Sequence, residues 1–116
     1  MYGLTVRWSL VDAPGGAAEA LREYVTGTSL ARFSAMDGLC FKTWRMREGE
    51  WFEGTYVWGS AVERDAFAEQ FSATGTDNPG SQLIGSAPAL IEPFEVVAVA
   101  EGLAGFTPGP GPGSAS

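Results

Sequence analysis

The sequence contains no histidine and only one cysteine, Cys40, among 116 residues. A single cysteine cannot form an internal disulfide or a thiolate cluster, and without imidazole neither haem nor zinc has its usual ligands. The absence of histidine also removes the commonest general base. Any chemistry must use carboxylate, tyrosine, tryptophan, lysine, arginine or backbone groups unless a cofactor binds, and we predict neither metal nor cofactor. Cys40 is expected to be a small apolar residue of the core.

Positive charge is also scarce, since seven basic residues stand against fourteen acidic ones and the net charge is −7. Phosphate binding needs a surplus of lysine and arginine, so we expect no binding to nucleic acid or to an anionic membrane. No apolar run approaches the roughly 18 residues of a membrane-spanning helix. The first residues, MYGLTVRW, enter a strand pattern at once and do not resemble a signal peptide, so we expect a cytoplasmic protein.

Aromatic residues are concentrated between Asp37 and Gly59. Aromatic and β-branched residues alternate with polar ones over Leu39–Arg47 and over Trp51–Trp58, and Gly49 lies in the charged turn between the two runs. This pattern predicts a β-hairpin. Three of the four tryptophans and one tyrosine belong to it: Trp44, Trp51, Trp58 and Tyr56. So much aromatic area predicts either a large core or an apolar cavity.

Two further strands are predicted from the same kind of alternation. Residues 3–11 place Arg7 on a mixed face, and the opposite face is wholly apolar. That apolar face consists of Leu4, Val6, Trp8 and Leu10. Residues 89–100 form the last strand, and Pro93 favours an edge position because proline cannot donate to a neighbouring strand.

Helical spacing of apolar residues predicts two helices. The first extends from about Ala17 to Ala35, and Gly27 with Thr28 weakens its middle, so that one bent helix or two pieces are equally consistent with the pattern. The second begins with a capping box at Ser60 and is ended by Gly75. Its predicted buried stripe is Val62, Phe67 and Phe71. A short helical turn is predicted over residues 81–85.

The resulting order is strand, helix, strand, strand, helix, strand. It predicts an α+β, ferredoxin-like βαββαβ sandwich: a four-stranded antiparallel sheet with both helices on one face. We assign residues 1–101 to this domain and residues 102–116, which are rich in proline, glycine and serine, to a flexible tail. Two helices cover only one face of such a sheet, so a second copy is expected to cover the other in a homodimer.

The segment GLCFKTW at residues 38–44 is followed, after a charged turn, by GTYVW at residues 54–58 and by an acidic helix. In these features the chain resembles the YdhR-type mono-oxygenase family of the dimeric α+β barrel superfamily, which includes the antibiotic-biosynthesis mono-oxygenases. The resemblance extends over about residues 4–99. It implies a ferredoxin-like homodimer whose cavity, on the barrel side or on the helix side, holds a small apolar or aromatic molecule. The absence of histidine separates the chain from the haem-degrading branch.

The resemblance further implies a cofactor-independent mono-oxygenase for an aromatic or polyketide-type molecule. In that chemistry the substrate phenolate itself reduces dioxygen, and the protein deprotonates the phenol and stabilises the anion. As candidate catalytic residues, Lys42 or Arg7 would hold the phenolate and Tyr56 would relay a proton. The candidate substrate-binding residues, which would stack on the rings, are Trp44, Trp58 and Trp8.

Other interpretations of the same residues stay open. The alternating aromatics could form only a core, Lys42 could extend along them to solvent, and Trp8 could serve packing or a dimer interface. The cavity could equally serve an isomerase or a cyclase, or a dimer that binds a hydrophobic molecule without catalysis. Glu53 is expected to be either exposed or paired with Arg45 of a second subunit.

Overall fold

The computed structural model describes residues 1–111 and follows the predicted order of strands and helices. The elements are β1 (Tyr2–Ser9), α1 (Ala17–Tyr24), the π-helical η1 (Val25–Ser29), α2 (Leu30–Ser34), β2 (Leu39–Arg47), β3 (Trp51–Trp58), α3 (Ala61–Thr74), α4 (Pro79–Ile84) and β4 (Leu90–Glu95). The helical turn predicted near residues 81–85 is part of α4. The two hairpin strands have the predicted bounds.

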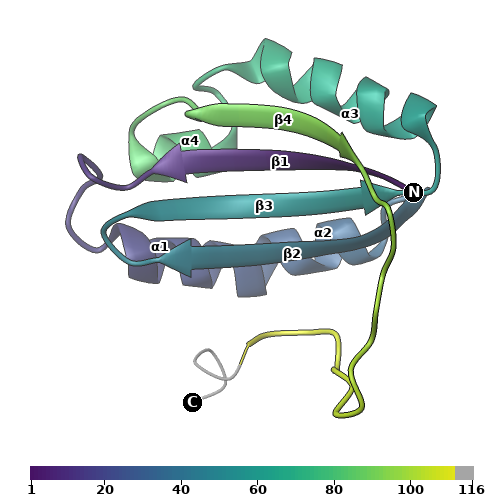
Figure 1. Cartoon of the computed structure of the whole chain (residues 1–116). Coiled ribbons are helices and arrows are strands. Elements are labelled where there is room, and N and C mark those ends of the chain that lie inside the picture. Colours follow the sequence, from purple (N-terminus) through teal and green to yellow (C-terminus); the bar gives the residue numbers. More distant parts are fainter. Residues whose placement is uncertain (112–116) are drawn as a thin grey trace.

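The four strands form one sheet in the order β2-β3-β1-β4, and every neighbouring pair is antiparallel (Figure 1). This is the predicted ferredoxin-like arrangement, with the hairpin at one edge and β4 at the other. Gly49 in the hairpin turn has a φ of 75°, which side chains other than glycine rarely adopt. Pro93 is in an edge strand, as predicted.

The pairing of β2 with β3 shifts between Leu39 and Phe41, so Cys40 is the extra residue of a β-bulge. Cys40 is exposed, and its predicted place in the core is wrong. The bulge takes this residue out of the alternation that would have turned it inwards. Beyond the bulge, the regular register resumes and carries Lys42 and Trp44 to the helix-covered side.

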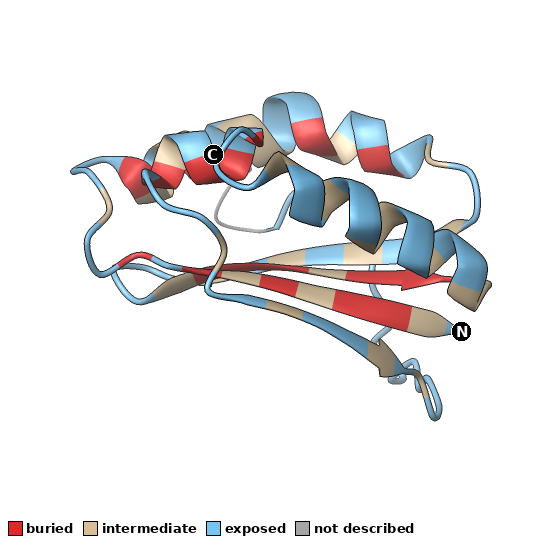
Figure 2. Ribbon diagram, turned by 90° about the horizontal axis from the view of Figure 1, so that it is seen from above, coloured by how far each residue is buried: buried red, intermediate tan, exposed pale blue. Residues whose placement is uncertain are grey.

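The helices cover one face of the sheet (Figure 2). Because side chains alternate along a strand, the even-numbered residues of β1 and β3 point towards those helices. The core on that side contains Leu4, Val6, Trp8, Phe52, Tyr56 and Trp58 from the strands and Leu21, Phe33 and Ile84 from the helices. We call the opposite side of the sheet the open face. Among the described residues no helix lies on it.

The first helical region is continuous, since η1 joins α1 to α2 without a break. The π-helical turn contains Gly27 and Thr28, the two residues predicted to weaken the middle. A π turn accommodates an extra residue within a helix. It therefore allows α1 and α2 to pack against the sheet as one continuous helical segment.

The N-cap of α3 is Ser60, whose hydroxyl accepts the N–H of Glu63 at 3.2 Å, and the C-cap is Gly75. Phe67 packs against the core as predicted. Val62 is 78% exposed, so its place in the predicted stripe is wrong. It lies five residues before Phe67, which places it about 140° around the helix from that side chain.

Strand β4 ends at Glu95, five residues before the predicted end. As an edge strand it can pair only with β1, and the last bond joins the Val96 N–H to the Met1 carbonyl at 3.1 Å. Residues 97–111 are exposed and form no helix or strand. Residues 112–116 of the predicted tail lie outside the described part. No described helix has the length and apolar character needed to cross a bilayer.

Candidate functional site

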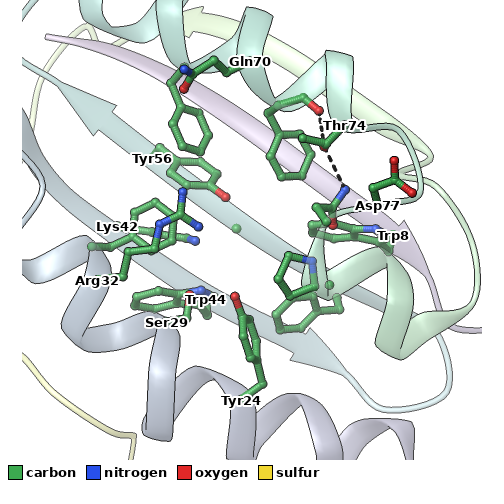
Figure 3. A pocket seen from close by; sticks show the side chains of 18 residues that line it. Trp8, Tyr24, Ser29, Arg32, Lys42, Trp44, Tyr56, Gln70, Thr74 and Asp77 are labelled. Carbon is green, nitrogen blue, oxygen red and sulfur yellow. Dashed lines mark hydrogen bonds between the residues drawn. The ribbon is translucent and has the colours of Figure 1, made fainter.

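A half-open cavity of about 470 Å³ lies between the sheet and the helices that cover it (Figure 3). The sheet contributes Trp8, Lys42, Trp44, Phe52, Gly54 and Tyr56. The helical segments and the loop before α4 contribute Tyr24, Ser29, Arg32, Phe33, Phe67, Gln70, Phe71, Thr74, Asp77, Asn78, Pro79 and Gly80. The size and the many aromatic side chains in the wall are typical of a small-molecule site.

The register of the hairpin assembles the centre of this cavity. Lys42 lies directly opposite Tyr56, and Trp44 lies opposite Gly54. A Cβ at Gly54 would be 3.1 Å from Lys42 Cε and 3.3 Å from the Tyr56 hydroxyl oxygen. Gly54 therefore leaves the space into which the polar ends of these two residues extend, and it forms part of the cavity floor.

The Lys42 amine is surrounded by aromatic rings. Its Nζ lies 3.5 Å from the ring centre of Phe33, 4.1 Å from that of Tyr56 and 4.4 Å from that of Trp44. Burial, together with the nearby positive charge of Arg32, lowers the pKa of Lys42 to about 6. The rings attract an ammonium and act in the opposite direction. At neutral pH the uncharged amine therefore predominates.

Tyr56 is almost fully enclosed in the cavity wall, with 3% of its surface exposed. Its ring stacks on Trp58 with the centres 5.4 Å apart and the planes 4° from parallel, and it packs edge-on against Phe33. Burial raises the pKa of Tyr56 and outweighs the opposing effect of Arg32. The hydroxyl therefore stays protonated at neutral pH and can donate a hydrogen bond into the cavity.

Trp8 and α4 close one end of the cavity. The Trp8 Nε1–H donates to Ser81 Oγ at 2.9 Å, a hydrogen bond buried between β1 and α4. A Cβ at Gly80 would lie 3.1 Å from the Trp8 ring, so the absence of a side chain there permits the close approach. Asn78 holds the start of α4 by accepting the Ser81 N–H at 2.8 Å. The indole is fixed by its polar edge, and its ring lines the cavity.

Four of the six predicted site residues meet in this cavity: Lys42, Tyr56, Trp44 and Trp8. Trp58 lies behind Tyr56, is 1% exposed and does not line the cavity. Arg7 lies on the open face and does not reach the cavity. Its position follows from alternation, because Arg7 and Trp8 are neighbours in β1 and must point to opposite sides.

Arg7 belongs to a separate cluster around Glu53. Its Nη2 is 2.9 Å from Glu53 Oε1, Arg45 pairs with the other carboxylate oxygen, and the Thr55 hydroxyl donates to that same oxygen at 3.1 Å. Burial favours a raised pKa for Glu53, but the hydrogen bonds from Arg45, Arg7 and Thr55 prevail and the pKa is lowered. Glu53 is therefore buried and paired within its own chain, which corrects both predicted alternatives.

Sequence reasoning missed several residues that line the cavity. Arg32 and Tyr24 come from the first helical region, and Gln70 and Asp77 come from α3 and the loop after it. Their positions depend on how the helices pack on the sheet, and no local pattern reveals this. Gly54 gave a usable signal, because an isolated glycine inside a strand often marks a place where other groups approach closely.

No group of three or more cysteine, aspartate or glutamate side chains that could hold a metal ion occurs within residues 1–111. The polar groups that face the cavity are an amine, a guanidinium, phenols, hydroxyls, two amides and one carboxylate. This set suits an organic molecule with hydrogen-bonding groups better than a metal ion, which prefers several converging oxygen, nitrogen or sulfur ligands.

The fold is found in solved structures of other proteins. A protein of unknown function from Nitrosomonas europaea superposes with a TM-score of 0.61 over 85% of this chain and 91% of that protein, at 21% identity. A proposed antibiotic biosynthesis monooxygenase from Chloroflexus aurantiacus superposes with a TM-score of 0.50 over 85% of this chain and 95% of that protein, at 19% identity. The chain shares their fold. The sequence matches no family model and no curated protein.

Proposed function

We propose that the chain is a cofactor-independent mono-oxygenase for an aromatic or polyketide-type phenol, with the cavity between sheet and helices as its active site. The observation that carries this proposal is Lys42, a largely uncharged amine among three aromatic rings in a cavity of substrate size. The likeness to an antibiotic biosynthesis monooxygenase supports it at the level of the fold. The GLCFKTW and GTYVW segments support a place in the YdhR-type family.

In the proposed mechanism Lys42 acts as the general base. The neutral amine accepts the proton of a substrate phenol, which produces an ammonium beside a phenolate. The rings of Phe33, Trp44 and Tyr56 attract this ammonium once it forms. Trp8 and Trp44 provide flat surfaces for the substrate rings. Burial thus keeps the Lys42 amine free to accept a proton, and the rings stabilise the ammonium that forms when it does.

The substrate supplies the electrons. The phenolate transfers them to dioxygen, and in the net reaction of an anthrone-like substrate a CH₂ group becomes a carbonyl. One atom of dioxygen becomes the carbonyl oxygen, and the other leaves as water with the two displaced hydrogens. The Tyr56 hydroxyl, which remains protonated, donates a hydrogen bond to the reduced oxygen species.

The other two predicted site residues are used differently or not at all. Trp58 supports the ring of Tyr56 from behind through the stacked contact. Arg7 has no part in the mechanism, because it is paired with Glu53 on the opposite side of the sheet. Arg32 is instead the positively charged residue of the cavity wall, and it adds to the larger effect of burial in keeping the Lys42 amine deprotonated.

Oxygen uptake with an anthrone-like phenol tests this function. Lys42→Met is expected to lower the rate by about 100-fold or more, as for the loss of a general base. Tyr56→Phe is expected to lower it by about 100-fold, as for the loss of one hydrogen-bond donor to an oxyanion. Arg47→Lys, an exposed substitution on the same strand, should leave the rate unchanged. Unchanged oxygen uptake in both cavity variants would rule the mechanism out.

A non-catalytic binder is the second candidate, and the aromatic lining of the cavity favours it. Trp8 and Trp44 face the cavity, so a bound polycyclic phenol should quench tryptophan fluorescence under either function. Only the mono-oxygenase would then consume oxygen. Quenching without oxygen uptake would support the binder, and a changed product without oxygen uptake would support an isomerase or a cyclase.

We further infer that the chain acts as a homodimer built sheet against sheet, as a dimeric α+β barrel. No described helix covers the open face, although Phe41 is 40% exposed on it and Leu90 is 39% exposed (Figure 2). Phe94 covers Gly3 on the same face, where a Cβ would lie 2.0 Å from its ring. Apolar side chains therefore flank the ion-paired centre, and a second copy seated on this face would remove their surface from water.

A further inference from the structure

We propose that Lys42 is a nucleophilic amine that forms an imine with aromatic aldehydes and unhindered aryl ketones that enter the cavity. This activity differs from oxygenation, although it uses the same cavity, because the amine attacks carbon and oxygen gas takes no part. It would make the site a carbonyl-binding site with a reversible covalent bond to its ligand.

The position of the amine is the first argument. Lys42 is the only lysine in the chain, and it points into the cavity instead of into solvent (Figure 3). Its three ring neighbours form flat walls around the Nζ atom, at 3.5 to 4.4 Å from the ring centres. An aryl aldehyde that stacks against those walls would hold its carbonyl carbon next to the nitrogen.

The position of Tyr56 is the second argument. Lys42 Cε and the Tyr56 hydroxyl oxygen both lie within 3.3 Å of one point, the Cβ position of a side chain at Gly54. A carbonyl between the two groups can therefore meet the amine at carbon and accept a hydrogen bond from the hydroxyl at oxygen. That hydrogen bond polarises the carbonyl in the direction that the attack needs.

The charge around the amine is the third argument. Burial and Arg32 lower the pKa of Lys42 to about 6, and the titratable or charged side chains that line the cavity are Tyr24, Arg32, Tyr56 and Asp77. At pH 7 about nine-tenths of such an amine is uncharged, against about one part in three thousand at the ordinary value of 10.5. Desolvation and a neighbouring cation are the two known ways to activate a lysine nucleophile.

The step balances without an oxidant. Nζ adds to the carbonyl carbon, the two amine hydrogens pass to the carbonyl oxygen, and this oxygen leaves as water when the C=N bond forms. Sodium borohydride then adds a hydride to the imine carbon and water adds a proton to the nitrogen, which fixes the adduct as a secondary amine. The half-open cavity gives the leaving water a path to solvent.

The experiment is borohydride trapping of 2-naphthaldehyde at pH 7 under nitrogen, followed by intact mass measurement and peptide mapping. The matched control is Arg47→Lys, which places an ordinary exposed amine on the same strand of the same molecule. We expect Lys42 to be labelled at least about tenfold faster than position 47. The larger uncharged fraction of the Lys42 amine should outweigh its lower accessibility and its weaker basicity. Arg32→Gln should slow labelling of Lys42 at pH 7 and leave position 47 unaffected.

Equal labelling of the two positions, or labelling only at position 47 or at the amino terminus, would overturn the proposal. A fold check by circular dichroism is needed only for Arg32→Gln, since the main comparison is made within one folded protein. The outcome is independent of the proposed oxygenase. Trapping at Lys42 without any oxygen uptake would retain the imine and reject the oxygenase, and oxygen uptake without trapping would do the reverse.

Discussion

At the scale of single residues, Lys42 and Tyr56 are kept uncharged by the same cause. Burial penalises an ammonium and a phenolate alike, so it lowers the pKa of Lys42 and raises that of Tyr56. The two side chains face each other across β2 and β3 and so present a free base beside a hydrogen-bond donor. Groups whose pKa values are strongly shifted in a cavity are typical of functional sites.

The shifted pKa of Lys42 predicts a measurable dependence of stability on pH. The folded chain releases this proton near pH 6 and the unfolded chain near 10.5, so between these values the unfolded state binds more protons and stability rises with pH. Lys42→Met should remove this slope, which is at most about 1.4 kcal/mol per pH unit for one proton. Urea unfolding of both proteins between pH 6.5 and 9.5 measures the difference.

Arg47→Lys serves as the control for this titration, because an exposed lysine has nearly the same pKa in both states and should leave the slope unchanged. The titration of other groups is common to the compared proteins and cancels in the difference. Parallel stability curves for the native chain and Lys42→Met would show that Lys42 is an ordinary charged lysine. Both roles given to the free amine would then be untenable.

At the scale of elements, the hairpin was the most predictable part of the chain. Residues at equal distances from Gly49 face each other, which pairs Lys42 with Tyr56 and Arg45 with Glu53. Alternation also separates Arg7 from Trp8, so only one of these two could join any single cavity. Local pattern therefore contained enough to assemble the β2–β3 part of the site and to exclude Arg7.

The contribution of the helices could not be predicted in the same way. Arg32 is part of the cavity because α2 packs against β2. No local sequence pattern predicts this contact between a helix and a strand. How deeply Lys42 is buried depends on the same packing, so the local sequence pattern could not predict its shifted pKa. The bulge at Cys40 shows a further limit, since one extra residue changes which side chains face the core.

Helix α3 carries one wall of the cavity, and its stability depends on the cap at Ser60. The Ser60 hydroxyl accepts the Glu63 N–H at 3.2 Å and donates to Glu63 Oε1 at 2.9 Å. Ser60→Ala removes both hydrogen bonds and is expected to lower the free energy of unfolding by about 1 kcal/mol. Ser60→Thr keeps the acceptor and should lose less. Equal urea midpoints for the native chain and Ser60→Ala would contradict this account of the helix start.

At the scale of the whole molecule, the two faces of the sheet have separate roles. The helix-covered face contains the cavity, which is lined by residues of the strands, of the helices and of the loop before α4. The open face contains the Glu53 cluster and exposed apolar side chains, and it is the face proposed to meet a second copy. Ligand binding and dimerisation can therefore be tested independently, with substitutions on opposite sides of one sheet.

The dimer prediction rests on Phe41, which is 40% exposed at the edge strand β2 on the open face. Phe41→Glu should place a charge in the interface and shift sedimentation from twice the monomer mass towards the monomer mass, because an unpaired charge is costly to bury. Val62→Glu is the matched control, since Val62 is 78% exposed on α3 and lies on the other side of the molecule.

Three outcomes of the sedimentation measurement can be distinguished. Dissociation caused by Phe41→Glu and not by Val62→Glu would place the interface on the open face. Dissociation caused by Val62→Glu would place it on the helices, where it would lie beside the cavity. A native chain that sediments as a monomer at every concentration would reject the dimer. Quenching of Trp8 and Trp44 by an aromatic ligand should then persist, because both residues line the cavity on the side of the sheet opposite the open face.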